Sequence, residues 1–433
     1  MHRGCLLGLF LSMGFLSPAA LHLHANTLTL SLEDSIERGI ENSLNLQKSL
    51  IDLSIAEYSA NRLWAEVFPT ISGSLGASYE SRFFSGDGFE MNKDGARNSA
   101  SLGVTLSLNA GIPYTIKNIQ LLYQTRLLQY EDARNQLEIQ LTKNFFSLIA
   151  DRDNLAVFAD ILNLAQRQYE RNHVAFNNGL IGELTLVQSR LALENARYNL
   201  NVANSAFTGR MRDFLVQLGL PHDTDAALDG KIETAKVEFD VDQLIREYLP
   251  RRPDIANMRY EIERLENAER QTVYSTKAPS LSLSAQWSSS NFSPFTDSLR
   301  GSASLSIPID PWIPGTSKNQ AVRNASLAIE KARLDLQNVE IVAAAQIRSL
   351  AANLKDSWDS IAIARLSMAI AERNYQLAEQ GFRSGTVESL RLEDAQNEFA
   401  NTRQRLLRTE LTYFNMILDI SAALNIKWKE LMQ

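Results

Sequence analysis

Two stretches of the chain, residues 141–179 (LTKNFFSLIADRDNLAVFADILNLAQRQYERNHVAFNNG) and residues 347–385 (IRSLAANLKDSWDSIAIARLSMAIAERNYQLAEQGFRSG), share one pattern at an offset of 206 residues. In both, a large apolar residue recurs every seven positions and a glycine ends the run. The first series is Leu141, Leu148, Leu155, Leu162, Tyr169 and Phe176, and the second is Ile347, Leu354, Ile361, Met368, Tyr375 and Phe382. This period is typical of helices that supercoil against their neighbours. We therefore predict two copies of one long helix.

Beyond each glycine a second apolar series begins with the same spacing. These series are Leu186, Leu193, Leu200, Phe207 and Phe214, matched by Leu392, Phe399, Leu406, Tyr413 and Ile420. The breaks between series end in Gly179 and Gly385, and glycine can adopt the positive φ that ends a helix. Each copy is therefore predicted to form a long helical hairpin, with its tip at residues 177–182 or 383–387. Ordinary amphipathic core helices would explain one such series, but four in register favour coiled-coil hairpins.

A different pattern precedes each hairpin, where four segments alternate strictly between apolar and small polar residues. The segments cover residues 70–79, 98–108, 280–288 and 298–309, with loops expected at 83–97 and 289–297. In the first segment Ile71 and Leu75 lie on one face, whereas Ser72 and Ser74 lie on the other. Such faces fit transmembrane β-strands whose serine side lines a wet lumen. A half-buried sheet of a soluble protein would show the same alternation.

Four strands cannot close a barrel in lipid, because an open edge would leave unpaired backbone groups in hydrocarbon. Self-association is therefore predicted, and two copies would supply eight strands, three copies twelve. Twelve strands leave a channel, which the serine-rich faces suit better. The predicted fold class is thus mixed and mainly α, with long coiled-coil helical hairpins and four transmembrane β-strands in each chain.

The segments around the strands complete the predicted organisation. A leading helix is expected before each β-hairpin, and a proline stands at each helix-to-strand junction. The helices cover residues 32–68 and 242–277, the prolines are Pro69 and Pro279, and the β-hairpins span residues 70–110 and 280–309. The polar residues 221–241 form a connector between the copies, which we expect to pack outside the helices and midway along them.

Residues 1–25 have the pattern of a secretory signal peptide, with Arg3 before an apolar core and Ala25 as a small residue for cleavage. The one cysteine, Cys5, lies in this segment. The rest of the chain would then contain no cysteine, and its two histidines, His173 and His222, lie far apart in sequence. A disulfide scaffold and a metal or catalytic cluster of Cys or His are therefore not expected.

Charge and composition argue against a nucleic-acid partner and against catalysis. A net charge of −7 is unsuited to nucleic acid, because neutralising phosphates needs a basic surface. The sequence also contains no phosphate-binding glycine-rich loop. The carboxylate pairs Glu33-Asp34 and Glu393-Asp394 are better explained as solvated helix faces than as acid–base pairs. We expect no enzymatic activity and no cofactor.

The arrangement resembles the TolC-like family of outer-membrane efflux proteins. The residues that carry the resemblance are Tyr169 with Gly179-Leu180, Phe382 with Gly385-Thr386, Arg252-Pro253-Asp254-Ile255, Val67-Phe68-Pro69 and Ala278-Pro279. Each motif alone is weak, but their order and the duplication make the resemblance specific. It covers essentially the whole chain after the signal peptide, with a first repeat at residues 26–220 and a second at residues 242–433.

The resemblance implies a homotrimer with a 12-stranded β-barrel in the outer membrane and a helical barrel in the periplasm. Such a channel is a passive conduit in a tripartite efflux system, exporting drugs or other solutes. Its partners are outer-membrane lipid, a periplasmic adaptor (membrane fusion) protein and an inner-membrane transporter of RND, ABC or MFS type. The adaptor would contact the helical tips, at Asn178, Gly179, Leu180, Ser384, Gly385 and Thr386.

The resemblance also implies a pore constriction just beyond the tips, where acidic residues commonly stand six and nine positions after the second tip glycine. Arg391 and Asp394 occupy these positions, and Thr185 and Gln188 correspond to them in the first copy. Asp394 keeps the family pattern, whereas Arg391 departs from it. A three-fold assembly would present each residue three times, so three arginines would offset the field of three carboxylates.

Other functions remain open at the level of sequence. A type I protein-secretion channel or a metal-efflux channel would share the same fold. A periplasmic coiled-coil scaffold without a pore is an alternative of another class, but such a scaffold would not need strands with a lipid-facing apolar side.

Overall fold

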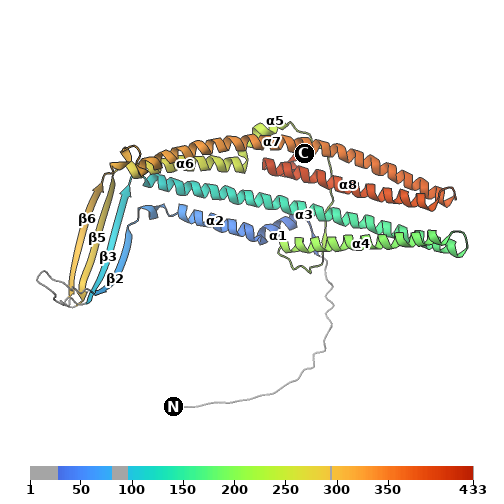
Figure 1. Ribbon diagram of the computed structural model, residues 1–433, viewed down its shortest axis with the longest axis horizontal. Helices are drawn as coiled ribbons and strands as arrows, with labels where there is room; N and C mark the ends of the chain where they lie inside the picture. The colour runs from blue at the N-terminus through green and yellow to red at the C-terminus, as the bar shows by residue number, and fades with distance from the viewer. Residues whose placement is uncertain (1–27, 80–95, 293–294, 433) are drawn as a thin grey trace, which may run out of the picture.

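The helices and the sheet occupy opposite ends of an elongated molecule (Figure 1). The computed structural model describes residues 28–79, 96–292 and 295–432. The predicted signal peptide, residues 1–25, and most of the loop expected at residues 83–97 lie outside the described residues. Most of the described residues lie in long helices, and four strands form one sheet. This confirms the predicted mainly α fold class.

Both halves of the chain contain the same series: two leading helices, a β-hairpin, a very long helix and a shorter returning helix. The first half has α1 (Leu32–Asn42), α2 (Leu44–Ala60), β2 (Thr70–Tyr79), β3 (Ala96–Asn109), α3 (Ile112–Asn177) and α4 (Glu183–Gln217). The second half has α5 (Val241–Tyr248), α6 (Pro253–Lys277), β5 (Ser280–Phe292), β6 (Phe295–Ser306), α7 (Ser317–Arg383) and α8 (Ser389–Leu424). The short elements are β1 (Leu28–Leu30), β4 (Ala226–Leu228), α9 (Trp428–Leu431) and the 3-10 turns η1 (Leu63–Val67), η2 (Leu249–Arg251) and η3 (Asp310–Trp312).

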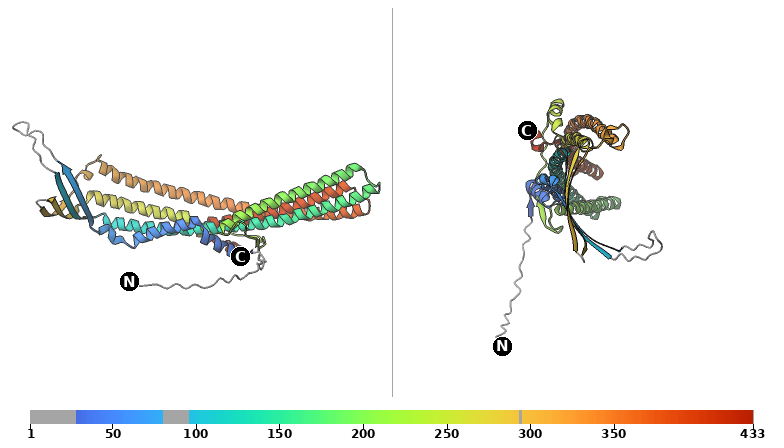
Figure 2. Two further views of the ribbon diagram at one scale, coloured as in Figure 1. Left: turned by 90° about the horizontal axis from the view of Figure 1, so that it is seen from below. Right: turned by 90° about the vertical axis from the view of Figure 1, so that its left-hand side faces the viewer.

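The two longest helices, α3 with 66 residues and α7 with 67, run the length of the helical part (Figure 2). At about 1.5 Å per residue, each extends about 100 Å. Near the sheet they pack with α2 and α6, and in the far half they pack with α4 and α8. Within the described residues, no helix combines the length and the apolar character that crossing a bilayer requires.

The shorter helices lie end to end along α3 and α7. One side chain forms a hydrogen bond between the ends of α1 and α4, and another between the start of α6 and the end of α8. The Asn42 amide, at the end of α1, donates to the carbonyl of Leu218 at the end of α4 (3.2 Å). The Arg252 guanidinium, before α6, donates to the carbonyl of Ala423 near the end of α8 (3.0 Å) and pairs with Asp254 (2.8 Å). Carbonyls at a helix C-terminus lack a partner within the helix, so they accept such donors, and the positive charge of Arg252 also suits the negative end of the helix dipole. The Arg-Pro-Asp-Ile motif therefore joins two stacked helices.

Both leading helices are broken, in contrast to the continuous helices predicted at residues 32–68 and 242–277. In the first half, the Ser43 side chain accepts the N–H of Leu46 and so begins a new helix, α2. In the second half, Pro250 lies in η2 and Pro253 begins α6, because proline lacks the N–H that a helix interior needs. A side-chain cap at Ser43 and the prolines Pro250 and Pro253 therefore divide the two leading helices.

A proline stands at each helix-to-strand junction in the structure. Pro69 lies between η1 and β2, and Pro279 lies between α6 and β5. The residues before them, Phe68 and Ala278, are extended, with ψ of 139° and 154°. Proline disfavours the helical conformation in the preceding residue, so the chain leaves the helix there and enters the strand.

The four long strands form one antiparallel sheet in the order β2-β3-β5-β6. The register aligns Ser74, Ser101, Ser288 and Ser298 in one row, and Leu102, Trp287 and Leu299 in another. Serines therefore share one face and apolar side chains share the other. The loop predicted at residues 289–297 is wrong for most of its length, because Ser289 pairs with Asp297 and the ladder continues to Phe292. Backbone pairing extends there through residues whose composition is typical of a loop.

The connector between the halves crosses the helices midway along the molecule (Figure 1). Its strand β4 pairs in parallel with β1. The Arg152 guanidinium donates to the carbonyls of Leu228 (2.9 Å) and Gly230 (3.1 Å), and the Tyr413 hydroxyl donates to the carbonyl of Ala235 (2.8 Å). Two buried clusters lie under this segment, with Leu30, Leu141, Phe145 and Phe214 in one and Ile347, Leu354, Ile361 and Tyr413 in the other. The core is therefore thickest at mid-length.

Replacing Arg252 by alanine should lower the free energy of unfolding by about 2 kcal/mol, because the carbonyl of Ala423 loses a charged hydrogen-bond donor. Urea unfolding of the purified protein measures this loss. The matched control is Arg251→Ala, at an exposed neighbour whose side chain makes no hydrogen bond or ion pair to the described residues. Equal losses in the two variants would contradict a specific role for Arg252.

Candidate functional site

The two helical tips have the same backbone geometry. At the first tip the N–H of Gly179 donates to Phe176 (2.9 Å) and the N–H of Leu180 donates to Ala175 (2.8 Å). At the second tip the N–H of Thr386 donates to Gly381 (2.9 Å), at the equivalent position. This is the Schellman arrangement, in which a residue with positive φ closes the helix. Gly179 and Gly385 have φ of 72° and 76°, so the glycines make the turns possible.

The predicted adaptor contacts lie on the outer surface of these turns. Asn178 and Leu180 are exposed, and the Leu180 side chain has 74% of its area open to solvent. The Ser384 hydroxyl lies 3.1 Å from that of Thr386, and each donates to the carbonyl of Gly381. A Cβ atom at Gly179 or Gly385 would have no neighbouring atom within 4 Å. The tips thus expose open backbone and one apolar side chain to solvent.

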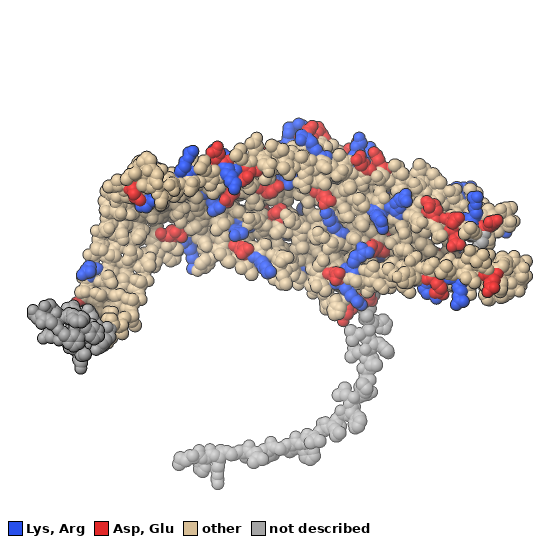
Figure 3. Space-filling view, in the orientation of Figure 1, with Lys and Arg blue, Asp and Glu red and all other residues tan. Residues whose placement is uncertain are grey.

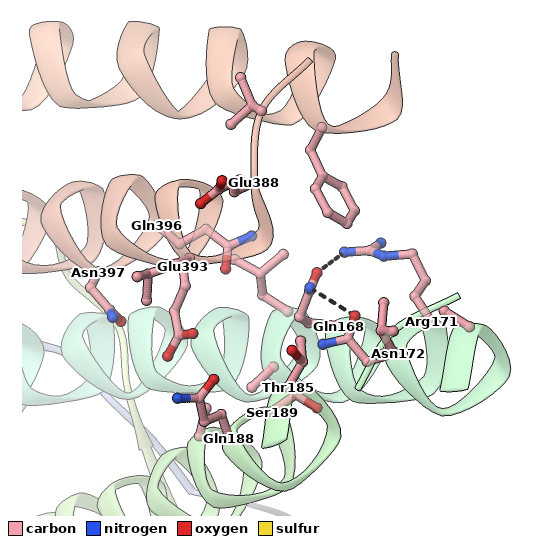
Figure 4. A pocket seen from close by; sticks show the side chains of 18 of the residues that line it. Gln168, Arg171, Asn172, Thr185, Gln188, Ser189, Glu388, Glu393, Gln396 and Asn397 are labelled. Carbon is pink, nitrogen blue, oxygen red and sulfur yellow. Dashed lines mark hydrogen bonds between the residues drawn. The ribbon is translucent and has the colours of Figure 1, made fainter. Parts of the chain in front are cut away.

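A groove of about 790 Å³ runs between the two helical hairpins close to their tips (Figure 4). Helices α3 and α4 form one wall, and α8 with the end of α7 forms the other. Its polar lining comprises Gln168, Arg171, Asn172, Thr185, Gln188, Ser189, Glu388, Glu393, Gln396 and Asn397. The buried amide nitrogen of Gln396 has no hydrogen-bond partner among the described residues. The seam between the hairpins is therefore polar here, in contrast to the apolar clusters at mid-length.

A cation–π contact and an ion pair join the two hairpins in the tip half. The Arg171 guanidinium of α3 lies 5.7 Å from the ring centre of Phe382 on α7 and donates to the amide oxygen of Gln168 (2.6 Å). Farther from the tip, Arg403 of α8 pairs with Asp160 of α3 (2.8 Å). Exposed ion pairs and cation–π contacts of this kind contribute little each.

The four predicted constriction residues do not form one cluster within the chain. Thr185 and Gln188 on α4 line the groove between the hairpins. Arg391 and Asp394 on α8 are exposed and lie outside that lining, on either side of the buried Leu392. Their assignment to a pore constriction remains a prediction, because it depends on how several copies assemble.

Glu393 is the groove residue that the sequence pattern did not single out, because its pairing with Asp394 suggested a solvated face. Figure 4 shows its side chain directed from α8 toward Gln188 of α4. The sequence did contain a signal for this placement. Glu393 directly follows Leu392 of the apolar series, and Gln396 lies four residues after Leu392. Charged and amide side chains beside a heptad position indicate a polar seam.

Burial raises the pKa of the Glu393 carboxyl, and the neighbouring Asp394 adds to the shift. The other charged side chains that line the groove are Arg171 and Glu388. Desolvation disfavours the carboxylate, so ionising Glu393 costs more in the groove than in water. The described residues contain no group of three or more His, Cys, Asp or Glu side chains that could hold a metal ion.

Comparison with known proteins identifies the family. A family model described as outer membrane efflux protein matches residues 36–210 and 244–425, most of the chain. The chain belongs to the outer membrane efflux protein family. The resemblance to TolC-like proteins is thereby confirmed. No curated protein matches the sequence of this efflux protein.

Solved structures of outer-membrane channels share the fold of this efflux protein. The CmeC channel of Campylobacter jejuni has a TM-score of 0.74 and 19% identity, covering 91% of this chain and 85% of that chain. VceC of Vibrio cholerae has a TM-score of 0.72 and 15% identity, covering 92% and 96%. MtrE of Neisseria gonorrhoeae, titled as an open state, has a TM-score of 0.72 and 15% identity, covering 93% and 90%. Identities this low establish the fold of the efflux protein alone.

Replacing Gly179 or Gly385 by alanine should destabilise the tip turn of the efflux protein by about 1 kcal/mol, because a Cβ disfavours positive φ. Faster amide hydrogen exchange around the altered tip measures this loss. Asparagine at the same positions is the matched control, since it adopts positive φ more readily than alanine. If asparagine destabilises the turn as much as alanine does, the positive φ is not the cause.

Glu393→Gln should make the tip half more stable near neutral pH. The raised pKa means that the folded state binds the proton more tightly than the unfolded chain, so stability falls as pH rises from the ordinary glutamate pKa to the raised one. The cost is absent below this window and complete above it. Hydrogen exchange in α8 at about pH 4 and about pH 7 should therefore differ less in the variant than in the parent protein.

Glu398→Gln, at an exposed position of the same helix, is the control for the loss of one negative charge. It should leave the pH dependence of exchange as in the parent protein. A pH dependence that persists unchanged in Glu393→Gln would show that another group is responsible.

Proposed function

We propose that this protein is the outer-membrane channel of a tripartite efflux system and that three copies assemble into one passive conduit. The observation that carries the proposal is the open four-stranded sheet, with one apolar and one serine-rich face. The sheet spans the outer membrane and the helices extend into the periplasm. A periplasmic adaptor contacts the tips, and an inner-membrane transporter of RND, ABC or MFS type supplies the energy.

The apolar face of the sheet supports insertion into lipid. Leu75 and Leu299 on this face are 86% and 78% exposed in the single chain. In the space-filling view, charged side chains are spread over the helices, whereas the sheet is almost free of them on the visible face (Figure 3). On the opposite face, serine hydroxyls pair across strands, as between Ser74 and Ser101 (2.7 Å). A lipid-facing exterior and a hydrated lumen account for the two faces together.

The edges of the sheet support assembly from several copies. Strands β2 and β6 are outermost, and each pairs on one side only within the described residues. Unpaired backbone groups cost several kcal/mol each in hydrocarbon. Three chains supply twelve strands from four each, which leaves a lumen lined by serine.

Unburied helix faces support the same assembly in the periplasm. On α4, the residues Leu184, Leu191 and Tyr198 recur at seven-residue spacing, and all three are exposed. On α7, Ile363, Ile370 and Leu377 do the same. Heptad stripes are typical of helices that pack against another helix. Neighbouring copies provide that partner for both stripes in the proposed helical barrel.

The tips and the adjoining turns of α8 give the conduit its proposed contacts. Leu180 and the open backbone at Gly179 and Gly385 face the adaptor. Arg391 and Asp394, both exposed on α8, face the pore in the proposed trimer. Three copies of each would set opposite charges side by side and leave a weak net field, so we expect little preference between cations and anions.

Separation of unheated outer-membrane fractions on denaturing gels tests the assembly. The expected result is an outer-membrane species that migrates as a trimer unless heated, is captured as a trimer by chemical crosslinking, and forms ion-conducting pores in planar bilayers. More than one chain is needed because one chain cannot pair its own sheet edges, and three chains supply the twelve strands of the proposed barrel. A monomer recovered from the soluble periplasm would overturn the proposal.

A further inference from the structure

Two exposed apolar clusters lie at the helical end of the sheet, one beside each outermost strand. The first holds Trp64 and Phe68, on and just after η1, with ring centres 5.3 Å apart. The second holds Ile309, Trp312 and Ile313, around η3. Trp64 is 57% exposed and Trp312 is 65% exposed. Large exposed apolar clusters of this kind mark surfaces that another molecule covers.

The topology fixes where these clusters go when the sheet closes. The first cluster directly precedes β2, which begins at Thr70, and the second directly follows β6, which ends at Ser306. The order β2-β3-β5-β6 with antiparallel neighbours makes β2 and β6 the two edges, running in opposite directions. The β6 edge of one copy can therefore continue the antiparallel ladder onto the β2 edge of the next. Both clusters then meet at the same end of that new strand pair.

We propose that Trp64 and Phe68 of one copy pack against Ile309 and Trp312 of the next, forming an aromatic seam between subunits at the base of the barrel. The seam rests on the proposed trimer and names side chains that would hold its sheet edges together. Each copy contributes one cluster to each of two neighbours, so the contact is head-to-tail and closes into a ring. A second copy of this chain is the occupant of each cluster.

Glu66 at the first cluster and the lysines at the second are complementary, which favours a second copy over another occupant. Arg62, two residues before Trp64, lies against the Tyr58 ring instead (3.9 Å from the ring centre). Glu66 lies between Trp64 and Phe68, is exposed, and makes no ion pair with the described residues. The second cluster carries positive charge, since the Lys277 ammonium lies 5.2 Å from the ring centre of Trp312. Lys318, at the start of α7, pairs with Asp310 of η3 (3.1 Å). Closing the seam would bring the Glu66 carboxylate toward these ammonium groups.

Paired cysteines test the seam. The single native cysteine, Cys5, lies in the predicted signal peptide, so introduced thiols react alone in the processed protein. In membranes that contain the protein, Trp64→Cys combined with Trp312→Cys should give covalent dimers and trimers with a short bismaleimide, and these should survive boiling. Each single variant should remain monomeric after boiling, because a head-to-tail contact never brings two identical positions together.

The matched control combines Trp64→Cys with Leu299→Cys. Leu299 is on β6, seven residues before that strand ends at Ser306. It therefore lies about 23 Å farther from the helical end than Ser306 does. This pair should not crosslink. If the double tryptophan replacement prevents assembly, Glu66→Cys with Lys318→Cys tests the same contact from two exposed polar positions.

Three results would overturn the seam while leaving the proposed function in place. One is an intact heat-sensitive trimer in which neither cysteine pair crosslinks. Another is crosslinking by a single variant, which would show like positions in contact. The third is quenching of a fluorophore on Trp312→Cys by spin-labelled phospholipid, which would show that lipid covers the cluster. Loss of the trimer in the unaltered protein would instead overturn the proposed function itself.

Discussion

Backbone groups along the outer edges of β2 and β6 are the constraint on which the arrangement of this protein depends. Within one chain the sheet has four strands in the order β2-β3-β5-β6, and an open sheet always has two such edges. In water the edge groups bond to solvent, but hydrocarbon offers no partner. A sheet with an apolar face for lipid therefore requires further strands. The proposed trimer, its barrel and the aromatic seam all answer this one requirement.

The helical part meets a different physical demand, which is length. Two helices of 66 and 67 residues cannot be buried in one compact core. They are instead covered piecewise, by α2 and α6 near the sheet and by α4 and α8 beyond it. The ends of these shorter helices meet at mid-length, where Asn42 and Arg252 donate to carbonyls at the ends of α4 and α8 and the connector crosses. The two large apolar clusters lie there, whereas polar side chains line the groove near the tips.

Much of this was predictable from the sequence, for reasons that particular residues make clear. The seven-residue series, the tip glycines Gly179 and Gly385 and the alternating strands are local patterns, and each follows from the geometry of one element. The misses were also local in origin. Ser43 and Pro253 restart helices within segments that we predicted as continuous, because a side-chain cap and the missing proline N–H interrupt them. Strands β5 and β6 continue through residues 289–292 and 295–297 because pairing, which composition does not reveal, satisfies their backbone.

The sequence by itself determined the duplicated unit, the two kinds of element and the faces that each buries, since spacing along the chain sets which side chains share a face. Only the tertiary structure decided which faces meet. It placed Glu393 and Gln188 across one groove, left Arg391 and Asp394 outside it, and set Trp64 and Trp312 beside opposite edges of the sheet. The physical reason is that these placements depend on segments distant in sequence, such as those of Gln188 and Glu393. They follow from how whole helices and strands pack, which no local period encodes.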